Sequence, residues 1–229
     1  MPLAGKGMLL TSMDIDGADE ADFNRWYDRE HFEERVAIDG FLEARRYVAH
    51  TGSPKYLSLY STVAIEVLDS PAYRARLHNP TAWSKTTMAG FKNMIRIVAR
   101  ITASRGTGRG AMLGILRLRP QAGHEGALRA VLNERLDPAK LDGIISMHLI
   151  EGDPTLSGPT AEIPAAAGGG AGDWFVLIDG TSASAVSSAL AMRFSGTAAP
   201  PGGLQMSSGV YGLMWDLAKS DISQRDVNT

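Results

Sequence analysis

The feature that most constrains the fold of this 229-residue chain is one order of strands and helices that occurs twice. Two turn sequences mark the copies, because Asp39-Gly40 has a counterpart in Asp142-Gly143, 103 residues later. The elements predicted around both turns follow the order β-α-β-β-α-β, which is the ferredoxin-like plan. A fixed offset combined with a shared element order predicts an internal duplication.

The first copy is outlined by alternating apolar residues and by helix-start signals. Asp19 is a candidate N-cap with acidic residues in the turn that follows it, and Ser70 precedes a proline at a first helical position. The predicted strands span residues 8–13, 41–50, 56–67 and 93–102. The predicted helices span residues 19–37, 71–77 and 80–88.

The second copy follows a short linker at 107–110. Its predicted strands span residues 112–119, 144–151, 174–179 and 210–217. Its predicted helices span residues 123–136 and 183–194. The segment 152–172 is rich in Gly, Ala and Pro, which predicts a flexible surface loop in place of a tight hairpin turn. Residues 223–229 are expected to form a frayed tail.

The strand predicted at 56–67 has two different faces. Leu57 and Leu59 share one face, which suits a core covered by helices. Tyr56 and Tyr60 share the other face, which suits a second sheet or a ligand. The same division into a covered and an uncovered face is expected of both predicted sheets.

The uncovered faces of the two sheets can bury their side chains only against each other. We therefore predict an α+β fold in which two tandem ferredoxin-like units, at 1–106 and 110–222, pack sheet to sheet. Together they would form a pseudo-twofold, dimeric-type α+β barrel within one chain. Association of whole chains into a homo-oligomer stays open.

The composition is that of a soluble globular protein, with 44% hydrophobic and 21% charged residues. A net charge of −2 gives no electrostatic reason to expect nucleic acid, which requires clustered Lys and Arg. No apolar run approaches the roughly 18 residues of a membrane span, and the first seven residues lack the apolar core of a secretion signal. The absence of cysteine excludes disulfides and thiolate nucleophiles. A cytoplasmic protein is expected.

The helix predicted at 19–37 carries the most informative side chains. With about 100° per residue, one side of it forms an aromatic stripe with carboxylates, whose members are Phe23, Trp26, Tyr27, Glu30 and Glu34. Arg35 is predicted to point elsewhere, and His31 lies at the edge of the stripe. Because burying an unpaired carboxylate is costly, Glu30 needs a partner or a wet cavity. Glu30 and His31 can act as acid and base near neutral pH, and they are the candidate catalytic residues.

A structural alternative exists for Glu30. An ion pair with Arg45 or Arg46 on the adjoining strand would compensate its buried charge and would lock the helix to the sheet. The two arginines point to opposite faces of that strand, so only one of them can meet Glu30 directly. Either arginine is also a candidate anchor for an anionic substrate.

Aromatic and cationic side chains of the first copy are candidates for lining a pocket for an aromatic or polyketide-like ligand. The candidate substrate-binding residues are Trp26, Tyr47, Tyr60, Arg45, Arg46 and Trp83. For each of them the alternative is ordinary core packing or a structural ion pair. Two alternatives also exist for Arg96 and Arg100: they contact an anion, or they form ion pairs between the two units.

No metal site and no obligatory cofactor is predicted. The five histidines include neither an i,i+4 pair nor an H-E-x-x-H sequence, and the chain has no Walker, dinucleotide-binding or nucleophile-elbow motif. Haem held by a single axial histidine stays open. His148 takes the position that corresponds to Arg45 at the 103-residue offset, which indicates that the two copies have diverged.

Residues 22–47 contain the pattern W-x-x-x-E-H…G-F…R-R-Y, made by Trp26, Glu30, His31, Gly40, Phe41, Arg45, Arg46 and Tyr47. This pattern resembles that of dimeric α+β barrel proteins, and in particular the EthD-like branch and related uncharacterised proteins. The likeness covers about residues 8–103, whereas the second half shares only the element order. The superfamily it resembles includes cofactor-free monooxygenases, polyketide cyclases, lactone isomerases, haem-degrading enzymes and dehydratases. The resemblance therefore implies the fold more firmly than the reaction.

The leading hypothesis is an enzyme that binds a small aromatic or polyketide-like compound and transforms it by acid–base chemistry without an obligatory cofactor. Isomerisation, cyclisation, lyase chemistry and cofactor-free oxidation all stay open. His31 would be the acid or base, oriented by Glu30 and by Arg45 or Arg46. The rival hypothesis is a non-catalytic ligand-binding or assembly protein with the same fold, which a dry interior with Glu30 paired to arginine would favour.

Overall fold

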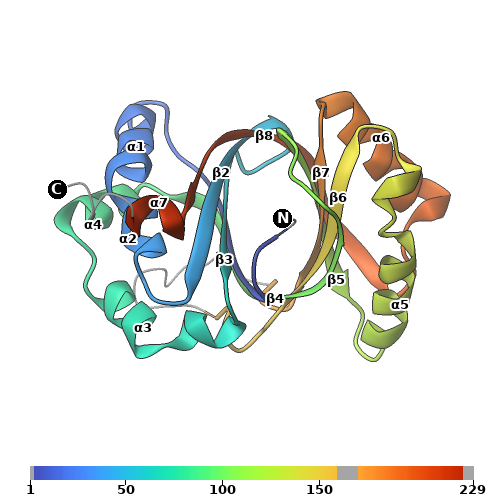
Figure 1. Ribbon diagram of the computed structural model, residues 1–229, viewed down its shortest axis with the longest axis horizontal. Helices are drawn as coiled ribbons and strands as arrows, with labels where there is room; N and C mark the ends of the chain where they lie inside the picture. Colours follow the sequence, from blue (N-terminus) through green and yellow to red (C-terminus); the bar gives the residue numbers. More distant parts are fainter. Residues whose placement is uncertain (1–2, 159–169, 224–229) are drawn as a thin grey trace.

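A computed structural model describes residues 3–158 and 170–223 of the chain. In these ranges, antiparallel strands close into one barrel, and helices pack outside it on two opposite sides (Figure 1). The predicted α+β barrel is confirmed. The strands of the first half are β1 (Gly7–Asp14), β2 (Phe41–Thr51), β3 (Tyr56–Thr62) and β4 (Lys92–Gly106). The strands of the second half are β5 (Met112–Pro120), β6 (Ile144–Gly152), β7 (Trp174–Gly180) and β8 (Gly203–Ala218).

The strand order around the barrel is β1-β3-β2-β8-β5-β7-β6-β4. The first half therefore contributes four adjacent strands in the order β4-β1-β3-β2, and the second half contributes β8-β5-β7-β6. Two seams join the halves, one between β2 and β8 and the other between β4 and β6. Because the edge strands of one half pair with those of the other, closure leaves no strand edge exposed in the described barrel.

The two halves share a local irregularity. The register between β2 and β3 shifts just before Glu43, which pairs with Ser61. The register between β6 and β7 shifts just before Ser146, which pairs with Asp179. Bulges of this kind re-aim side chains, and these two lie 103 residues apart, at the offset that separates the two turns. Each half thus places a polar pair at the same point of its sheet.

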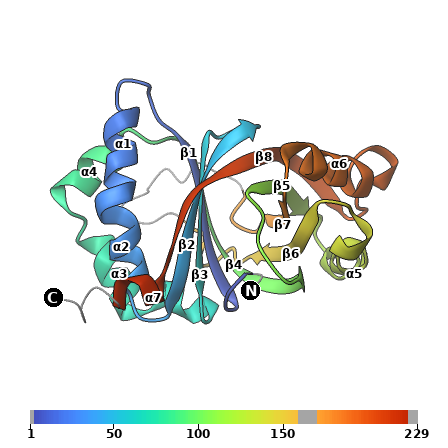
Figure 2. The same ribbon diagram turned by 45° about the horizontal axis from the view of Figure 1, so that its top comes forward.

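Helices cover the outer face of each sheet. In the first half they are α1 (Glu20–Trp26), the π-helical turn η1 (Tyr27–His31), α2 (Phe32–Val36), the 3₁₀ helix η2 (Ile65–Asp69), α3 (Pro71–His78) and α4 (Ala82–Ala89). In the second half they are α5 (Glu125–Arg135), η3 (Pro138–Lys140), α6 (Ala183–Phe194) and η4 (Gly196–Ala198). The short α7 (Lys219–Ser223) lies with the helices of the first half (Figure 2). In the described ranges no helix has the length and apolar character that a membrane span requires.

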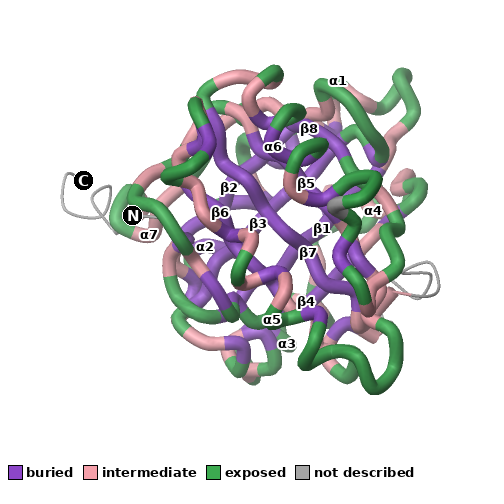
Figure 3. The backbone as a smooth tube through the Cα atoms, turned by 90° about the vertical axis from the view of Figure 1, so that its right-hand side faces the viewer, coloured by how far each residue is buried: buried purple, intermediate pink, exposed green. Residues whose placement is uncertain are grey.

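Three apolar cores follow from this layering. The barrel interior is filled from both sheets by side chains that include Met8, Leu10, Leu57, Leu59, Leu113, Ile115, Phe175 and Leu177. A second core lies between the helices and the sheet of the first half and is rich in aromatic residues. A third, mostly aliphatic core lies between α5, α6 and the sheet of the second half. Figure 3 shows the barrel strands as mainly buried chain surrounded by exposed helical turns and loops.

The predicted roles of the two faces of β3 are wrong. Leu57 and Leu59 point into the barrel, whereas Tyr56 and Tyr60 point to the helices. The interior near the leucines is apolar, whereas the helix layer offers polar partners to Tyr56 and an aromatic core to Tyr60. The Tyr56 hydroxyl, for example, donates to the Glu20 carboxylate of α1.

Two predicted element ends are also wrong. The strand expected to reach residue 67 ends at Thr62, and the 3₁₀ helix η2 follows it. The last strand begins at Gly203 instead of residue 210, because the segment 203–209 pairs with β5. Of the predicted loop at 152–172, residues 159–169 lie outside the described part of the chain, as do residues 224–229 of the predicted tail.

Candidate functional site

The helix that carries Trp26, Glu30 and His31 is not a regular α-helix. Between α1 and α2 it contains the π-helical turn η1, from Tyr27 to His31. Hydrogen bonds in such a turn reach one residue further along the chain than in an α-helix, so the turn accommodates one extra residue. Side chains after the turn therefore lie on a different side of the helix from the one that a period of 3.6 residues predicts.

The effect of the π-turn is clearest at Arg35. A regular helix would point this side chain away from the aromatic stripe, but Arg35 is only 5% exposed. His31, predicted at the edge of the stripe, is buried as well, at 9% exposure. Both side chains face the sheet, where they line a cavity.

This cavity encloses about 40 Å³ between the α1–η1–α2 helix and the outer face of β1, β3 and β4. Residues of α3 and α4 complete its wall. The lining residues are Leu9, Thr11, Met13, Trp26, Tyr27, His31, Arg35, Tyr60, Tyr73, Leu77, Met88, Phe91, Met94 and Arg96. The wall is thus mainly apolar, with a few polar groups among the apolar ones, as in small-molecule sites.

Four of the lining residues present a buried polar atom that has no hydrogen-bond partner. The atoms are Thr11 Oγ1, His31 Nδ1, Arg35 Nη1 and Tyr60 Oη. The Tyr60 hydroxyl has the Tyr27 hydroxyl as a neighbour but makes no well-formed hydrogen bond with it. Leaving a buried polar group unpaired costs about 1–3 kcal/mol. Four such groups around one cavity are therefore expensive for folding and point to binding.

His31 is held by aromatic contacts. Its ring stacks on Trp26 with 4.1 Å between centroids, and Tyr27 and Tyr60 contact it edge-on. Burial, followed by the positive charges of Arg35 and Arg46, lowers the pKa of His31 well below 6.5. The imidazole is consequently neutral at pH 7 and can accept a proton. Burial likewise raises the pKa of Tyr60 well above 10, which keeps its hydroxyl protonated.

The lowered pKa of His31 predicts that the protein loses stability on acidification. The unfolded chain binds a proton at His31 near pH 6.5, but the folded chain resists it, so the free energy of unfolding falls as the pH drops from about 6.5 toward the lower, folded-state pKa. Above about pH 6.5, His31 adds nothing to the pH dependence of the free energy of unfolding. Urea unfolding at a series of pH values should show a slope up to about 1.4 kcal/mol per pH unit steeper in the wild type than in His31→Gln. Parallel curves for the two proteins would contradict the assignment.

Glu30 has partners other than those predicted. Its Oε1 atom accepts hydrogen bonds from Trp26 Nε1 at 3.1 Å, Thr81 Oγ1 at 2.6 Å and Ser84 Oγ at 3.0 Å. The ion pair expected with Arg45 or Arg46 is not formed, so that expectation is wrong. Hydroxyl groups of α4 and its N-cap satisfy the carboxylate instead. Glu30 does not line the cavity; it fixes the indole ring that stacks on His31.

The two predicted arginines are used elsewhere. The Arg46 guanidinium lies in the helix layer, 4.1 Å from the centre of the Tyr27 ring, and donates to Asn24 Oδ1 at 2.7 Å. Arg45 points into the barrel, where it donates to Glu43 Oε1 at 2.8 Å. Neither arginine lines the cavity beside His31.

The remaining predicted aromatic residues divide in the same way. Trp26 and Tyr60 line the cavity. Tyr47 lies in the barrel interior, where burial raises the pKa of its hydroxyl to about 12. Trp83 lies on α4, and its indole donates to Asp22 at 2.9 Å. The structure therefore brings together three predicted site residues, Trp26, His31 and Tyr60.

Five polar residues of the wall were not predicted as site residues: Thr11, Tyr27, Arg35, Tyr73 and Arg96. Arg35 is hidden from sequence patterns by the π-turn. Thr11 lies on β1, which was predicted as a strand, but nothing in the sequence distinguishes it from the other residues of that strand as a site residue. For Arg96 the sequence leaves anion contacts and ion pairs between the units open. In the structure its guanidinium donates to the Leu156 carbonyl at 3.0 Å, and none of the described carboxylates accepts from it.

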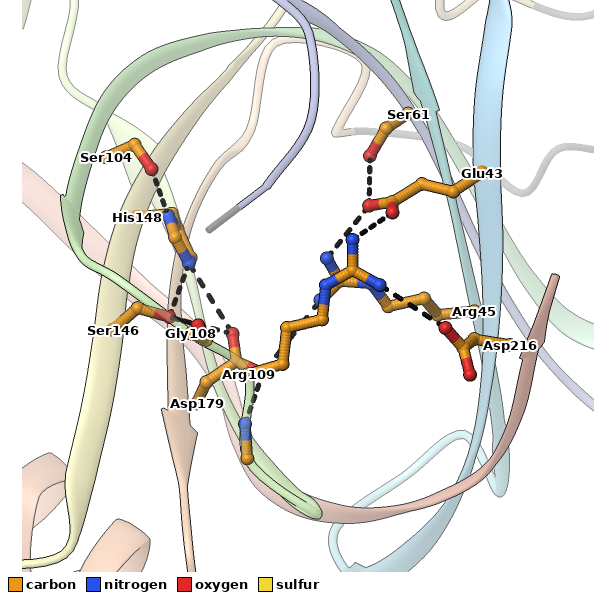
Figure 4. Close-up of polar contacts among 11 residues, drawn as sticks. Glu43, Arg45, Ser61, Ser104, Gly108, Arg109, Ser146, His148, Asp179 and Asp216 are labelled. Atoms are coloured by element: carbon orange, nitrogen blue, oxygen red, sulfur yellow. Dashed lines mark hydrogen bonds and ion pairs between the residues drawn. The ribbon is translucent and has the colours of Figure 1, made fainter. Parts of the chain in front are cut away.

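A second polar cluster lies inside the barrel, away from this cavity (Figure 4). Glu43 is at its centre and accepts from Arg45 at 2.8 Å, from Ser61 at 3.4 Å and from Arg109 of the linker. Arg109 also contacts Asp216 of β8 at 3.3 Å. The linker and β8, which belong to the second half by chain order, are thus tied to the sheet of the first half.

The second half contributes the other part of the cluster. His148 lies 3.0 Å from Ser146, 3.5 Å from Asp179 and 2.8 Å from Ser104 through its two ring nitrogens. Asp179 in turn lies 3.9 Å from Arg45. His148 and Ser146 are completely buried, and their polar atoms are bonded to one another and to neighbouring side chains, as in a structural network.

The described residues include no group of three or more histidine, aspartate or glutamate side chains placed to hold a metal ion. A porphyrin does not fit the cavity beside His31, because about 40 Å³ is room for only a few heavy atoms. The cavity residues therefore do not match a haem site.

Comparison with known proteins gives structural matches only. No family model matches the chain, and no curated protein matches its sequence. An anthrone oxidase-like protein superposes with a TM-score of 0.65 at 11% identity, over 93% of each chain. A proposed monooxygenase from Fusobacterium nucleatum superposes with a TM-score of 0.58 at 6% identity, over 95% of this chain and 96% of its own.

The chain has the fold of the dimeric α+β barrels. A haem-binding protein from Thermus thermophilus also matches, with a TM-score of 0.51 at 12% identity, over 100% of this chain and 97% of its own. At such identities the likeness shows the fold alone. The function of this chain has to be argued from its own cavity.

Proposed function

We propose that the cavity beside His31 binds a small molecule and that His31 transforms it by acid–base chemistry. The observation that carries the proposal is the set of unpaired polar atoms of Thr11, His31, Arg35 and Tyr60 around one cavity. Monooxygenase-like and anthrone oxidase-like structural neighbours support chemistry on small molecules within this fold.

In the proposed reaction the neutral imidazole of His31 accepts a proton from an acidic C–H or O–H group of the substrate. The electrons of that bond remain on the substrate and become an enolate or phenolate oxyanion. Arg35 lies close enough to lower the pKa of His31 by its charge. Its positive charge therefore favours a negative charge in the cavity, both one that the substrate already carries and one that develops on the oxyanion. Isomerisation, cyclisation, elimination and reaction with oxygen can all follow such an anion.

The other wall residues have supporting roles in this proposal. Tyr60, whose hydroxyl stays protonated, donates to the substrate oxygen. Trp26 holds the His31 ring by stacking, and Glu30 holds Trp26 through the indole N–H. Glu30 is in this reading a positioning residue, whereas the sequence suggested a direct catalytic role.

Proton abstraction can be tested without knowledge of the natural substrate. The purified protein is incubated in D₂O with enolisable carbonyl compounds, namely pyruvate, cyclohexanone and anthrone, and the loss of the acidic proton is followed by ¹H NMR. We expect exchange faster than in buffer for at least one compound. Exchange at the buffer rate for all of them, with no binding by saturation-transfer NMR, would overturn the proposal.

A non-catalytic ligand-binding protein is the second candidate. The observation that favours it is the size of the cavity, about 40 Å³, which is far below the ~150 Å³ that takes up benzene in an apolar cavity. Binding in the saturation-transfer experiment without proton exchange would select this candidate. A polyketide-sized ligand would require the side chains of the wall to move.

We also propose that the chain is a tandem duplication of a ferredoxin-like unit, at 1–106 and 110–222, from the EthD-like branch. The matching strand orders and the bulges before Glu43 and Ser146 support the duplication. In the second unit, Leu128 and Leu132 of α5 fill the layer between helix and sheet. The site is therefore assigned to the first unit only.

A further inference from the structure

The wall of the cavity beside His31 carries positive charge that no carboxylate of the described residues pairs with. Arg35 is 5% exposed, and none of the described carboxylates forms an ion pair with it. Its guanidinium packs 5.9 Å from the centre of the Tyr73 ring, and Nη1 has no hydrogen-bond partner. A buried charge without a partner costs several kcal/mol, so it is kept where something else compensates it.

Arg96 adds a second charge to the same wall. It is also 5% exposed, and its contacts are the Leu156 carbonyl at 3.0 Å and the Tyr73 hydroxyl at 3.5 Å. Both partners are neutral, and none of the carboxylates in residues 3–158 and 170–223 forms an ion pair with Arg96. By contrast Arg46, in the same helix layer, contacts Asp28 at 3.5 Å.

The wall, as far as the described part of the chain forms it, contains no aspartate and no glutamate. Its polar groups are the two guanidinium groups, the neutral His31 ring, the Trp26 indole N–H and the hydroxyls of Thr11, Tyr27, Tyr60 and Tyr73, all of which can donate a hydrogen bond. A cavity with two cations and no anion in a water-poor environment favours an anionic occupant.

The volume agrees with a carboxylate group. About 40 Å³ is room for a few heavy atoms, as in a carboxylate head group. The flexible side chains of Met13, Met88 and Met94 line the rest of the wall, and methionine adapts to variable shapes. A head group would thus be fixed while the remainder of the ligand displaces methionine side chains.

We propose that the site recognises a small carboxylic acid in its anionic form, with the carboxylate bound by Arg35 and Arg96. This inference rests on the proposed function, because it names the ligand class of the same cavity. Arginine suits the role, since its fork of N–H groups matches the two oxygens of a carboxylate. The substrate oxygen that develops charge next to His31 would then belong to an acid already anchored by its own head group.

The test compares each carboxylate with its neutral amide. Propionate with propionamide and benzoate with benzamide are titrated into the wild-type protein, and dissociation constants are obtained by saturation-transfer NMR. We expect each acid to bind at least about tenfold more tightly than its amide, because a hydrogen bond to a charged group is worth about 1.5–3 kcal/mol and 1.4 kcal/mol is tenfold. Arg35→Met and Arg96→Met should each weaken the acid by about 10- to 100-fold and leave the amide unchanged.

Arg100→Met is the matched control, since Arg100 lies on the same strand as Arg96 but is exposed and paired with Glu66. It should bind the acids as the wild type does. Arg35→Lys keeps the charge without the fork and should keep part of the affinity, which guards against a folding defect in Arg35→Met.

The outcomes separate this inference from the proposed function. If amides bind as tightly as acids and both are lost in His31→Gln, the carboxylate inference is overturned while the site stands. If neither the acids nor the amides bind, both the carboxylate inference and the proposed function are overturned. A loss of acid binding in Arg100→Met equal to that in Arg35→Met would also overturn the inference, because the effect would then be one of general charge.

Discussion

Replacing Glu43 by alanine is expected to lower the free energy of unfolding by about 3–5 kcal/mol. The carboxylate is 4% exposed and accepts from Arg45, Ser61 and Arg109 at the centre of the barrel cluster. Without it, Arg45 keeps its charge inside the barrel with only Asp179, at 3.9 Å, as a distant compensating group. The linker arginine also loses its inner partner, so the two halves are held less firmly.

Urea unfolding followed by circular dichroism measures this loss. The double variant Glu43→Leu/Arg45→Leu should be more stable than Glu43→Ala, since removing both charges leaves no unpaired ion in the interior. Glu66→Gln is the matched control, because Glu66 is exposed and pairs with Arg100 at the surface. It should change the stability by no more than about 0.5 kcal/mol. Equal effects of Glu43→Ala and Glu66→Gln would show that the cluster does not stabilise the barrel.

Local patterns in the sequence account for much of the fold. The helix predicted at 183–194 is observed with the same bounds as α6, because Ser182 caps it and apolar residues recur at helical spacing. Ser70 likewise caps α3 as predicted, with its side chain accepting from the Tyr73 backbone N–H. Barrel closure follows from a global argument, namely that two uncovered apolar sheet faces need each other. The helices and their caps depend on residues that are close together in the sequence. Barrel closure depends only on each sheet having one face that helices do not cover.

The candidate site depends on features that such patterns do not contain. Arg35 reaches the cavity only because the helix takes a π-turn, and no residue type in η1 announces that turn. Two of the three partners of Glu30, Thr81 and Ser84, lie more than 50 residues away, and their hydroxyl groups are common on any helix. The faces of β3 were reversed because a period of two gives the alternation but not the side that meets the helices.

The pocket and the barrel cluster show two different uses of buried arginine. The charge of Arg45 is paired with Glu43 within the chain, and this pairing serves the fold. Arg35 and Arg96 pair with no carboxylate in the part of the chain that the structure describes, which fits a site that binds an external anion. The difference in pairing separates the two arginine classes more clearly than burial does, because Arg45, at 2% exposure, and Arg96, at 5%, are buried to a similar degree.

His31→Ala is expected to reduce the rate of catalysed proton exchange by about 10²–10⁴-fold, the range typical of a general base. The imidazole is neutral and borders the cavity, and its Nδ1 has no partner. The Michaelis constant should change little, because the head group of the substrate is held by other residues. Exchange kinetics in D₂O with the best compound of the panel give both parameters.

Added imidazole distinguishes a base from a structural residue. A small base that diffuses into the space left by His31→Ala should restore part of the exchange rate, in proportion to its neutral concentration. Trp83→Phe is the matched control, since Trp83 belongs to the same helix layer but does not line the cavity. It should keep the wild-type rate. If His31→Ala instead unfolds the protein, or if the rate falls equally in both variants, the histidine serves packing, and the non-catalytic ligand-binding function becomes the better account of the cavity.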